Sequence, residues 1–172
     1  MTAGQPVDAI ASVASFFVSR VDTKADALLP DDSPLRGRLA IANAHLAYNR
    51  YRERFSDPRW EALAAAGARP QRPLWASTGT KDPAYSDVLY VEELIAPDVV
   101  NTMPEPTLRA FADHGRVSER LGASTAAAEA IVRSAESAGI DLAAITAQLE
   151  REGVRSFCAS YHDLIDRITH RA

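Results

Sequence analysis

A short polar loop directly after an apolar run carries side chains suited to binding an anion. Residues 77–81 read STGTK and follow residues 73–77, a proline-bounded apolar run typical of a buried strand. The loop supplies hydroxyl groups, a glycine and the cation Lys81. It lacks both the residue order of a P-loop and the Ser-x-x-Lys spacing of an acyl enzyme. These residues therefore favour phosphate binding at the rim of a site.

A second cation, Arg20, follows residues 9–18, a nearly continuous apolar run that predicts another buried strand. A helical pattern begins just after it, with Asp22 or Thr23 as the predicted N-cap. A guanidinium between the end of a strand and a helix N-terminus can hold a phosphate through two hydrogen bonds. The alternative interpretation, a surface arginine after a strand, stays open from these residues alone.

Covalent and metal chemistry have few candidates in this sequence. Lysine occurs only at positions 24 and 81, so a Schiff base formed within the chain would have to use one of them. Asp82 lies beside Lys81 and disfavours the lowered pKa that a nucleophilic amine needs. The histidines are scattered and form no ligand set. We therefore expect Lys81 to bind an anion, and we expect no metal site.

The composition restricts the class of partner and the compartment. The formal net charge is −4 and the basic residues are dispersed, which argues against a nucleic-acid partner. The lone Cys158 cannot form an intramolecular disulfide, and its helical surroundings predict a packed, small apolar group in a reducing environment. No apolar run approaches the ~20 residues of a membrane span. We expect a soluble, cytoplasmic protein without a membrane partner.

Three predicted strands position the cationic loops. They lie near residues 9–18, 73–77 and 98–102, and a helical pattern fills residues 86–95 between the last two. Strand, polar loop, helix and strand in this order are typical of an α/β protein, whose ligands bind beyond the carboxyl ends of the strands. The length of 172 residues suits one domain.

Helices are predicted for most of the remaining chain. They cover residues 35–55, 57–66, 107–113 and 124–171. Ser33, before Pro34, is the predicted N-cap of the first of them. Gly139 and Gly153 are predicted to end helices within the C-terminal region. Its apolar stripes are predicted to face the core, and they include Phe157, Leu164 and Ile168.

Three ordered motifs resemble the transaldolase family, in its longer bacterial branch. They are SVASFFVSRVD at residues 12–22, RPLWASTGTKDPAYSD at 72–87 and VNTMP at 100–104. The resemblance extends over essentially the whole chain, including EGVRSF at 152–157. It implies a (β/α)8 TIM-type barrel enzyme of the pentose phosphate pathway that needs no metal or organic cofactor. Such enzymes transfer a dihydroxyacetone unit from sedoheptulose 7-phosphate or fructose 6-phosphate to an aldose phosphate, through a lysine Schiff base.

The resemblance also implies roles for individual residues. The three predicted strands would be the sixth, seventh and eighth strands of the barrel. Arg20 would hold the phosphate of the sugar, and Lys81 would be a second phosphate contact. Ser15, Phe17 and Ser77 would line the pocket. Phosphate binding by loops late in the barrel agrees with the general behaviour of this fold.

The departure from the family pattern is as informative as the match. The family's Schiff-base lysine lies on the fourth strand in a motif like IKIPAT, which this sequence lacks. Residues 1–172 would then be a single C-terminal portion of the barrel, about its last three strands with a helix-rich C-terminal part. It would carry the phosphate-binding half, and the isolated chain would be inactive. A complete barrel typically needs about 250 residues.

Such a portion would leave strand edges open. We therefore expect the chain to pair with a complementing N-terminal barrel fragment or to self-associate. Two other functions stay open at this point. One is a non-catalytic sugar-phosphate-binding fragment. The other is a helical interaction protein that uses the arginine-rich face of residues 36–54, although a solvated face explains that pattern more simply.

Overall fold

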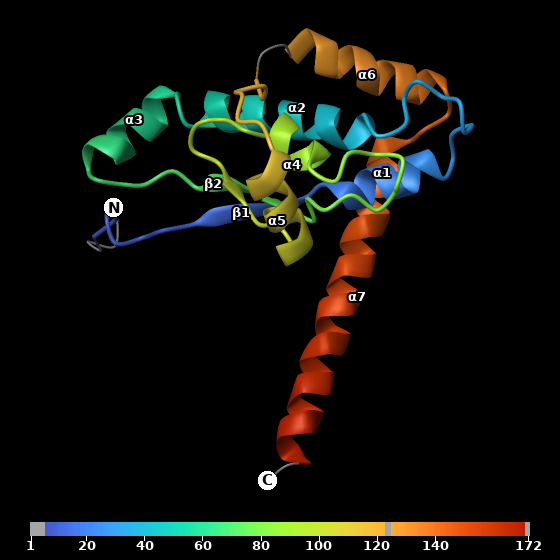
Figure 1. The fold of residues 1–172 in the computed structure, drawn as a ribbon. Coiled ribbons are helices and arrows are strands. Elements are labelled where there is room, and N and C mark those ends of the chain that lie inside the picture. The colour runs from blue at the N-terminus through green and yellow to red at the C-terminus, as the bar shows by residue number, and fades with distance from the viewer. Residues whose placement is uncertain (1–5, 123–124, 171–172) are drawn as a thin grey trace.

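The computed structural model describes residues 6–122 and 125–170, and it contains one parallel sheet (Figure 1). The strands are β1 (Val13–Phe17), β2 (Arg72–Ala76) and β3 (Val100–Asn101), in the order β1-β2-β3. In this register, Leu74 lies between Ser15 on one side and Val100 on the other. The α/β class is therefore confirmed, and each strand overlaps a range predicted from the sequence.

The first strand differs from its prediction in length and in burial. It covers residues 13–17 in place of 9–18, and its first three residues are exposed. The sequence predicted a strand covered on both faces. Within the described residues β1 is an edge strand that pairs only with β2, and apolar side chains such as Val13 remain in contact with solvent.

Helices connect the strands, and several of them pack on one side of the sheet. Between β1 and β2 lie α1 (Ser19–Asp26), α2 (Leu39–Arg54) and α3 (Pro58–Ala65), and α4 (Leu89–Glu93) lies between β2 and β3. After the sheet come α5 (Glu105–His114), α6 (Thr125–Ser137) and α7 (Leu142–Thr169). Figure 1 shows α2 and α6 packed together on one side of the sheet, while most of α7 projects away on the other.

Two predicted helix starts are wrong, and Asp22 is involved in both. Helix α1 begins at Ser19, so Asp22 lies inside it and is not its N-cap. Helix α2 begins at Leu39, well after Ser33. There the backbone N–H of Ala40 donates to the Asp22 carboxylate at 2.7 Å, and a distant side chain thus replaces a local cap. By contrast, α3 starts as predicted, because Asp57 accepts from the backbone N–H of Trp60 at 2.8 Å.

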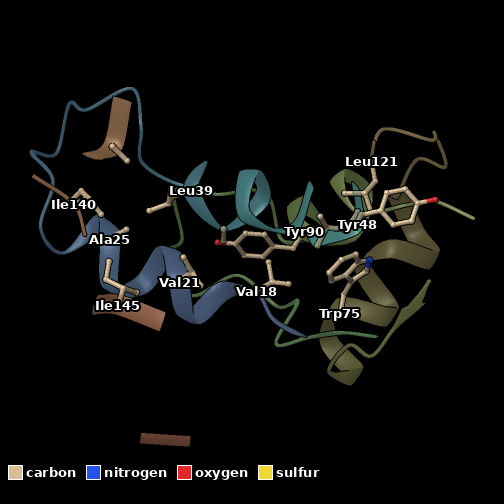
Figure 2. Packing of buried hydrophobic residues seen from close by; sticks show 14 of the residues in the cluster. Val18, Val21, Ala25, Leu39, Tyr48, Trp75, Tyr90, Leu121, Ile140 and Ile145 are labelled. Carbon is tan, nitrogen blue, oxygen red and sulfur yellow. The ribbon is translucent and has the colours of Figure 1, made fainter. Parts of the chain in front are cut away.

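The hydrophobic core lies between the sheet and helices α1, α2, α4 and α6 (Figure 2). Trp75 on the central strand is fully buried, and the ring of Phe16 packs edge-on against it with ring centroids 5.6 Å apart. Leu39 and Tyr90 complete this layer from the helical side. Truncating a buried tryptophan of this kind to alanine typically costs about 3–5 kcal/mol. The core therefore holds β1 and β2 against the helices.

Helix α7 is one continuous helix where the sequence predicted two. Gly153 does not end it, since a glycine inside a helix costs only about 1 kcal/mol relative to alanine. The first half packs on α1, and Lys24 Nζ lies 2.8 Å from the Glu152 carboxylate. Positions 124 and 171, which bounded the predicted helical region, lie outside the described residues.

The second half of α7 contradicts two predictions about burial. Phe157, Leu164 and Ile168 were predicted to face the core, but all three are exposed. Cys158, predicted to be packed, is exposed as well. The apolar stripe itself is present, but the described chain supplies no surface that covers it.

Candidate functional site

The carboxyl ends of the strands are tied together by backbone hydrogen bonds. The N–H of Val18 donates to the carbonyl oxygen of Ala76 at 2.9 Å, and that of Ser19 donates to Ser77 at 3.0 Å. Ser77 has a positive φ of 56°, a conformation that residues other than glycine rarely adopt. Strain of this kind is common at functional sites, because the surrounding contacts must hold it. These bonds place the start of α1, and with it Arg20, at the end of the sheet.

The loop after β2 is fixed from the other side by β3. The Thr78 hydroxyl is buried, 2.9 Å from Oδ1 of Asn101 and 3.0 Å from the carbonyl oxygen of Thr102. At Gly79 a Cβ would lie 3.0 Å from Cγ of Pro104, so the loop backbone approaches the start of α5 closely. The STGTK loop is therefore anchored through residues 77–79.

Arg20 lies at a cavity of about 550 Å³ between the sheet and α7. Ser15 and Phe17 line the same cavity, and the Arg20 guanidinium stands 4.7 Å from the centroid of the Phe17 ring. Within residues 6–122 and 125–170, no carboxylate is placed within ion-pair distance of Arg20. Its guanidinium is thus not paired there, although the side chain of Glu150 lines the same cavity.

Lys81 lies in a different place from the other predicted residues. It is exposed and lines a second cavity of about 540 Å³, whose other charged residues are Asp22, Asp26, Asp31, Arg36 and Asp82. The structure thus brings Arg20 together with Ser15 and Phe17, and it ties Ser77 to the residue before Arg20. It does not bring Lys81 into the cavity of Arg20. A shared phosphate contact by the two cations stays a prediction.

The sequence analysis missed a buried acidic network beside Lys81. Asp22, 1% exposed, accepts hydrogen bonds from the N–H of Ala40 and, at 2.8 Å, from the hydroxyl of Tyr90. Burial raises the pKa of Asp22 to about 6, although both hydrogen bonds lower it. The carboxyl and the Tyr90 hydroxyl therefore connect α1, α2 and α4 from inside the core.

Asp26 makes a second connection one turn later. Its carboxylate accepts from the hydroxyl of Tyr85 at 2.7 Å and from the N–H of Gly37 at 3.1 Å. Arg36 donates to the Asp26 carbonyl oxygen and also pairs with Asp82 at 3.3 Å. Arg36 is thus engaged by protein groups and is a weaker candidate for a ligand contact than Arg20.

A signal for this network was present in the sequence. Asp22 and Asp26 are four residues apart, so they share a helix face with the apolar Val18, Ala25 and Leu29. Two acidic residues on an apolar helix face predict buried carboxyls that need hydrogen-bond donors. The N-cap interpretation of Asp22 hid this pattern.

Metal binding and membrane insertion find no support in the part of the chain that the structure describes. It contains no group of three or more histidine, cysteine, aspartate or glutamate side chains placed to hold a metal ion. None of its helices combines the length and the apolar content needed to cross a membrane. His45 is half-buried and its pKa is lowered by that burial, so it is mainly neutral at pH 7.

The parallel sheet and the helices that connect its strands define an α/β protein, a class whose ligands bind beyond the carboxyl ends of the strands. A family model described as transaldolase/fructose-6-phosphate aldolase matches residues 1–168. The transaldolase of Parafrankia sp. is 53% identical over 174 residues, which cover 98% of this chain and 47% of that protein. That of Thermobifida fusca is 51% identical, with 98% of this chain and 48% of the relative covered.

The transaldolase of Mycolicibacterium smegmatis is similarly close, at 52% identity over 95% of this chain and 46% of that protein. The chain therefore belongs to the transaldolase/fructose-6-phosphate aldolase family, as the three motifs indicated. It spans about half the length of these relatives.

Proposed function

We propose that this chain is the sugar-phosphate-binding portion of a transaldolase. The substrates would be ketose and aldose phosphates of the pentose phosphate pathway, handled in the cytoplasm. The three parallel strands would be the last three of a (β/α)8 barrel, within one C-terminal portion formed by residues 1–172. The observation that supports this function best is Arg20, whose guanidinium lines an open cavity at the end of the sheet beside the N-terminus of α1.

Arg20 would hold the phosphate group of the sugar. Its guanidinium can donate two parallel hydrogen bonds, and the positive end of the α1 helix dipole adds to the field. Ser15 and Phe17 would face the sugar carbons from the same cavity. Ser77 would contribute its hydroxyl from the end of β2, next to the backbone bond that fixes Ser19.

Lys81 would have a weaker part in phosphate binding. It follows the carboxyl end of β2, as Arg20 follows that of β1, but it lines a different cavity with several aspartates. Its charge would attract the anion and its long side chain can turn toward the ligand. We expect Lys81→Met to weaken phosphate binding by about threefold, and Arg20→Ala to weaken it by at least about tenfold.

Covalent chemistry would need a lysine outside this chain. The family forms a Schiff base on a lysine in a motif that is absent here, and both lysines of this chain are poor nucleophile candidates. Lys24 is paired with Glu152, and Lys81 is an exposed cation beside Asp82. The complete site would form when the remaining barrel strands and their lysine are present beside these three strands.

Titration of the chain with inorganic phosphate and with fructose 6-phosphate, followed by isothermal calorimetry, tests the binding proposal. The Arg20→Ala variant should lose most of the affinity for both ligands. Arg109→Ala is the matched control, since Arg109 is exposed on α5 and pairs only with Glu105 among the described residues. Equal affinities in wild type and Arg20→Ala would refute the proposal.

Borohydride trapping with fructose 6-phosphate tests the division of labour. The chain alone should form no covalent adduct detectable by mass spectrometry, because it lacks the family lysine. A trapped adduct on Lys24 or Lys81 would show that the chain is catalytic by itself and would contradict the proposal. Phosphate binding without an adduct under any condition would favour the non-catalytic fragment.

A further inference from the structure

The second half of α7 carries an apolar face that nothing in the described chain covers. Its large apolar residues are each 40% to 64% exposed, and they recur at helical spacing. They are Val154, Phe157, Tyr161, Leu164, Ile165 and Ile168. Monomeric proteins rarely leave a contiguous apolar surface of this kind open to water. Figure 1 shows this half of the helix projecting away from the rest of the molecule.

The exposed face continues from a buried one. In the first half of α7, Ile145 is buried against α1, and Leu149 packs at the border of the core. The next turns line the cavity of about 550 Å³ that also holds Phe17 and Arg20. Phe157 belongs both to this cavity and to the exposed face. One surface thus runs from the candidate phosphate site along the length of the helix.

The edge of the sheet lies beside the same surface. Residues 15–17 of β1 line the cavity, and in the part of the chain that the structure describes β1 pairs on one side only, with β2. A further parallel strand added to β1 would therefore sit next to the cavity and close to α7. A single partner can cover both the open strand edge and the apolar helix face.

We propose that the exposed face of α7 is the docking surface for the rest of a transaldolase chain, the part that carries the remaining barrel strands. This inference rests on the proposed function. The length supports it, because the chain covers only 47% of its Parafrankia relative. The strand count also supports it, since two copies of a three-stranded sheet give too few strands for the eight of a closed barrel.

Docking would also affect the phosphate site. The partner would close the cavity between β1 and α7 and exclude water from it. Charge–charge attraction is stronger where water is excluded, so Arg20 should bind phosphate more tightly in the complex than in the chain alone.

The single cysteine gives a direct test of coverage, because Cys158 is exposed and lines the cavity next to Phe157. The probe is a recombinant segment of the Parafrankia transaldolase, taken from outside the stretch that matches this chain. Maleimide labelling of Cys158, read by mass spectrometry of this chain, should slow by at least about tenfold when the probe is added. Unchanged labelling in a complex that forms would overturn the proposal.

A pair of charge substitutions tests the face itself. Leu164→Asp places a carboxylate on the apolar face, and binding of the probe should weaken by at least about 30-fold. Ala159→Asp is the control, since Ala159 is exposed on the opposite side of the same helix and its variant should bind within about threefold of wild type. Circular dichroism of both variants verifies that α7 is intact. Equal binding by the two variants would refute the docking surface.

The remaining outcomes separate this inference from the proposed function. The inference is overturned if a folded probe forms no complex with the chain. It is also overturned if labelling of Cys158 slows as the chain's own concentration rises and dimers form, because the occupant is then a second copy. Neither result bears on phosphate binding by Arg20. The proposed function instead fails if Arg20→Ala binds phosphate as well as wild type does, whether or not the probe docks.

Discussion

The hydroxyl of Tyr90 donates a hydrogen bond of 2.8 Å to the carboxylate of Asp22, although 68 positions separate the two residues in the chain. The pair joins α1 to α4 across the core, and the second carboxylate oxygen of Asp22 accepts from the start of α2. This small polar contact therefore fixes the helices that follow β1 and β2, the two strands whose ends form the candidate site.

The pH dependence of stability should report the buried carboxyl. Burial raises the pKa of Asp22 from 3.8 to about 6, so the folded chain holds this proton more tightly than the unfolded chain does. The contribution of Asp22 to the free energy of unfolding is thus fully present below pH 3.8 and is lost as the pH rises through about 6. Asp22→Asn should remove this decline, which amounts to about 3 kcal/mol at most.

Urea unfolding of wild type and Asp22→Asn across this pH range measures the difference. Asp31→Asn is the matched control, because the Asp31 side chain is fully exposed. The pH profile of this variant should be the same as that of wild type. Parallel profiles for wild type and Asp22→Asn would show that Asp22 is not a buried acid with a raised pKa.

The hydroxyl of Tyr90 should matter more for stability than that of Tyr48. In Tyr90→Phe a buried carboxylate loses a donor, and the expected loss in free energy of unfolding is about 1–3 kcal/mol. The Tyr48 hydroxyl donates at 3.2 Å to the neutral carbonyl oxygen of Pro97, so Tyr48→Phe should cost about 0.5–1.5 kcal/mol. Denaturant midpoints of the two variants at pH 7 provide the comparison, and a larger loss in Tyr48→Phe would contradict this ranking.

Two glycines with similar backbone angles should differ in their tolerance of a side chain. Gly37 has φ 70°, and a Cβ there would lie 2.9 Å from Cζ of Tyr85. Gly139 has φ 87°, with no atom within 4 Å of an added Cβ. Gly139→Ala should cost about 1–2 kcal/mol for the left-handed backbone alone. Gly37→Ala should cost more, about 2–4 kcal/mol, because Tyr85 must also shift from Asp26. Thermal unfolding distinguishes the two, and equal losses would mean that the Tyr85 ring moves freely.

Gly153→Ala should stabilise the chain. Gly153 lies within α7, and an added Cβ would meet no atom within 4 Å. Replacing a glycine inside a helix by alanine gains about 0.5–1 kcal/mol by restricting the unfolded backbone. The melting temperature and the helical signal in circular dichroism should both rise. A lower melting temperature would contradict this prediction and would show that alanine disturbs the backbone conformation at Gly153.

The features that were predicted correctly from the sequence are those determined by residues close together in the chain. The apolar runs that end in polar loops gave the three parallel strands, and Asp57 before Pro58 gave the start of α3. The family followed from three motifs, since each of them lies in one continuous segment. Arg20 was found for the same reason, because it directly follows the first strand.

The features that it misplaced depend on contacts between distant segments. Asp22 caps α2 and not its own helix, because the fold brings Ala40 to its carboxylate. Gly153 carries no local signal strong enough to stop a helix that already packs on α1. Lys81 follows β2 as expected, but the path of its loop leads to the acidic cavity beside α1. Such outcomes are decided by tertiary packing, which overrides local preference.

The burial of Trp75 makes it an optical reporter for the sheet. Its indole has no contact with solvent, and the Phe16 ring from the neighbouring strand lies against it. An indole in apolar surroundings emits at shorter wavelength than one in water. Release of β1 from β2 would expose Trp75 and move its emission to the red. Binding of a partner strand to the free edge of β1 would leave this contact in place and would not shift the emission. Fluorescence therefore distinguishes separation of β1 from β2 from the addition of a strand to the sheet.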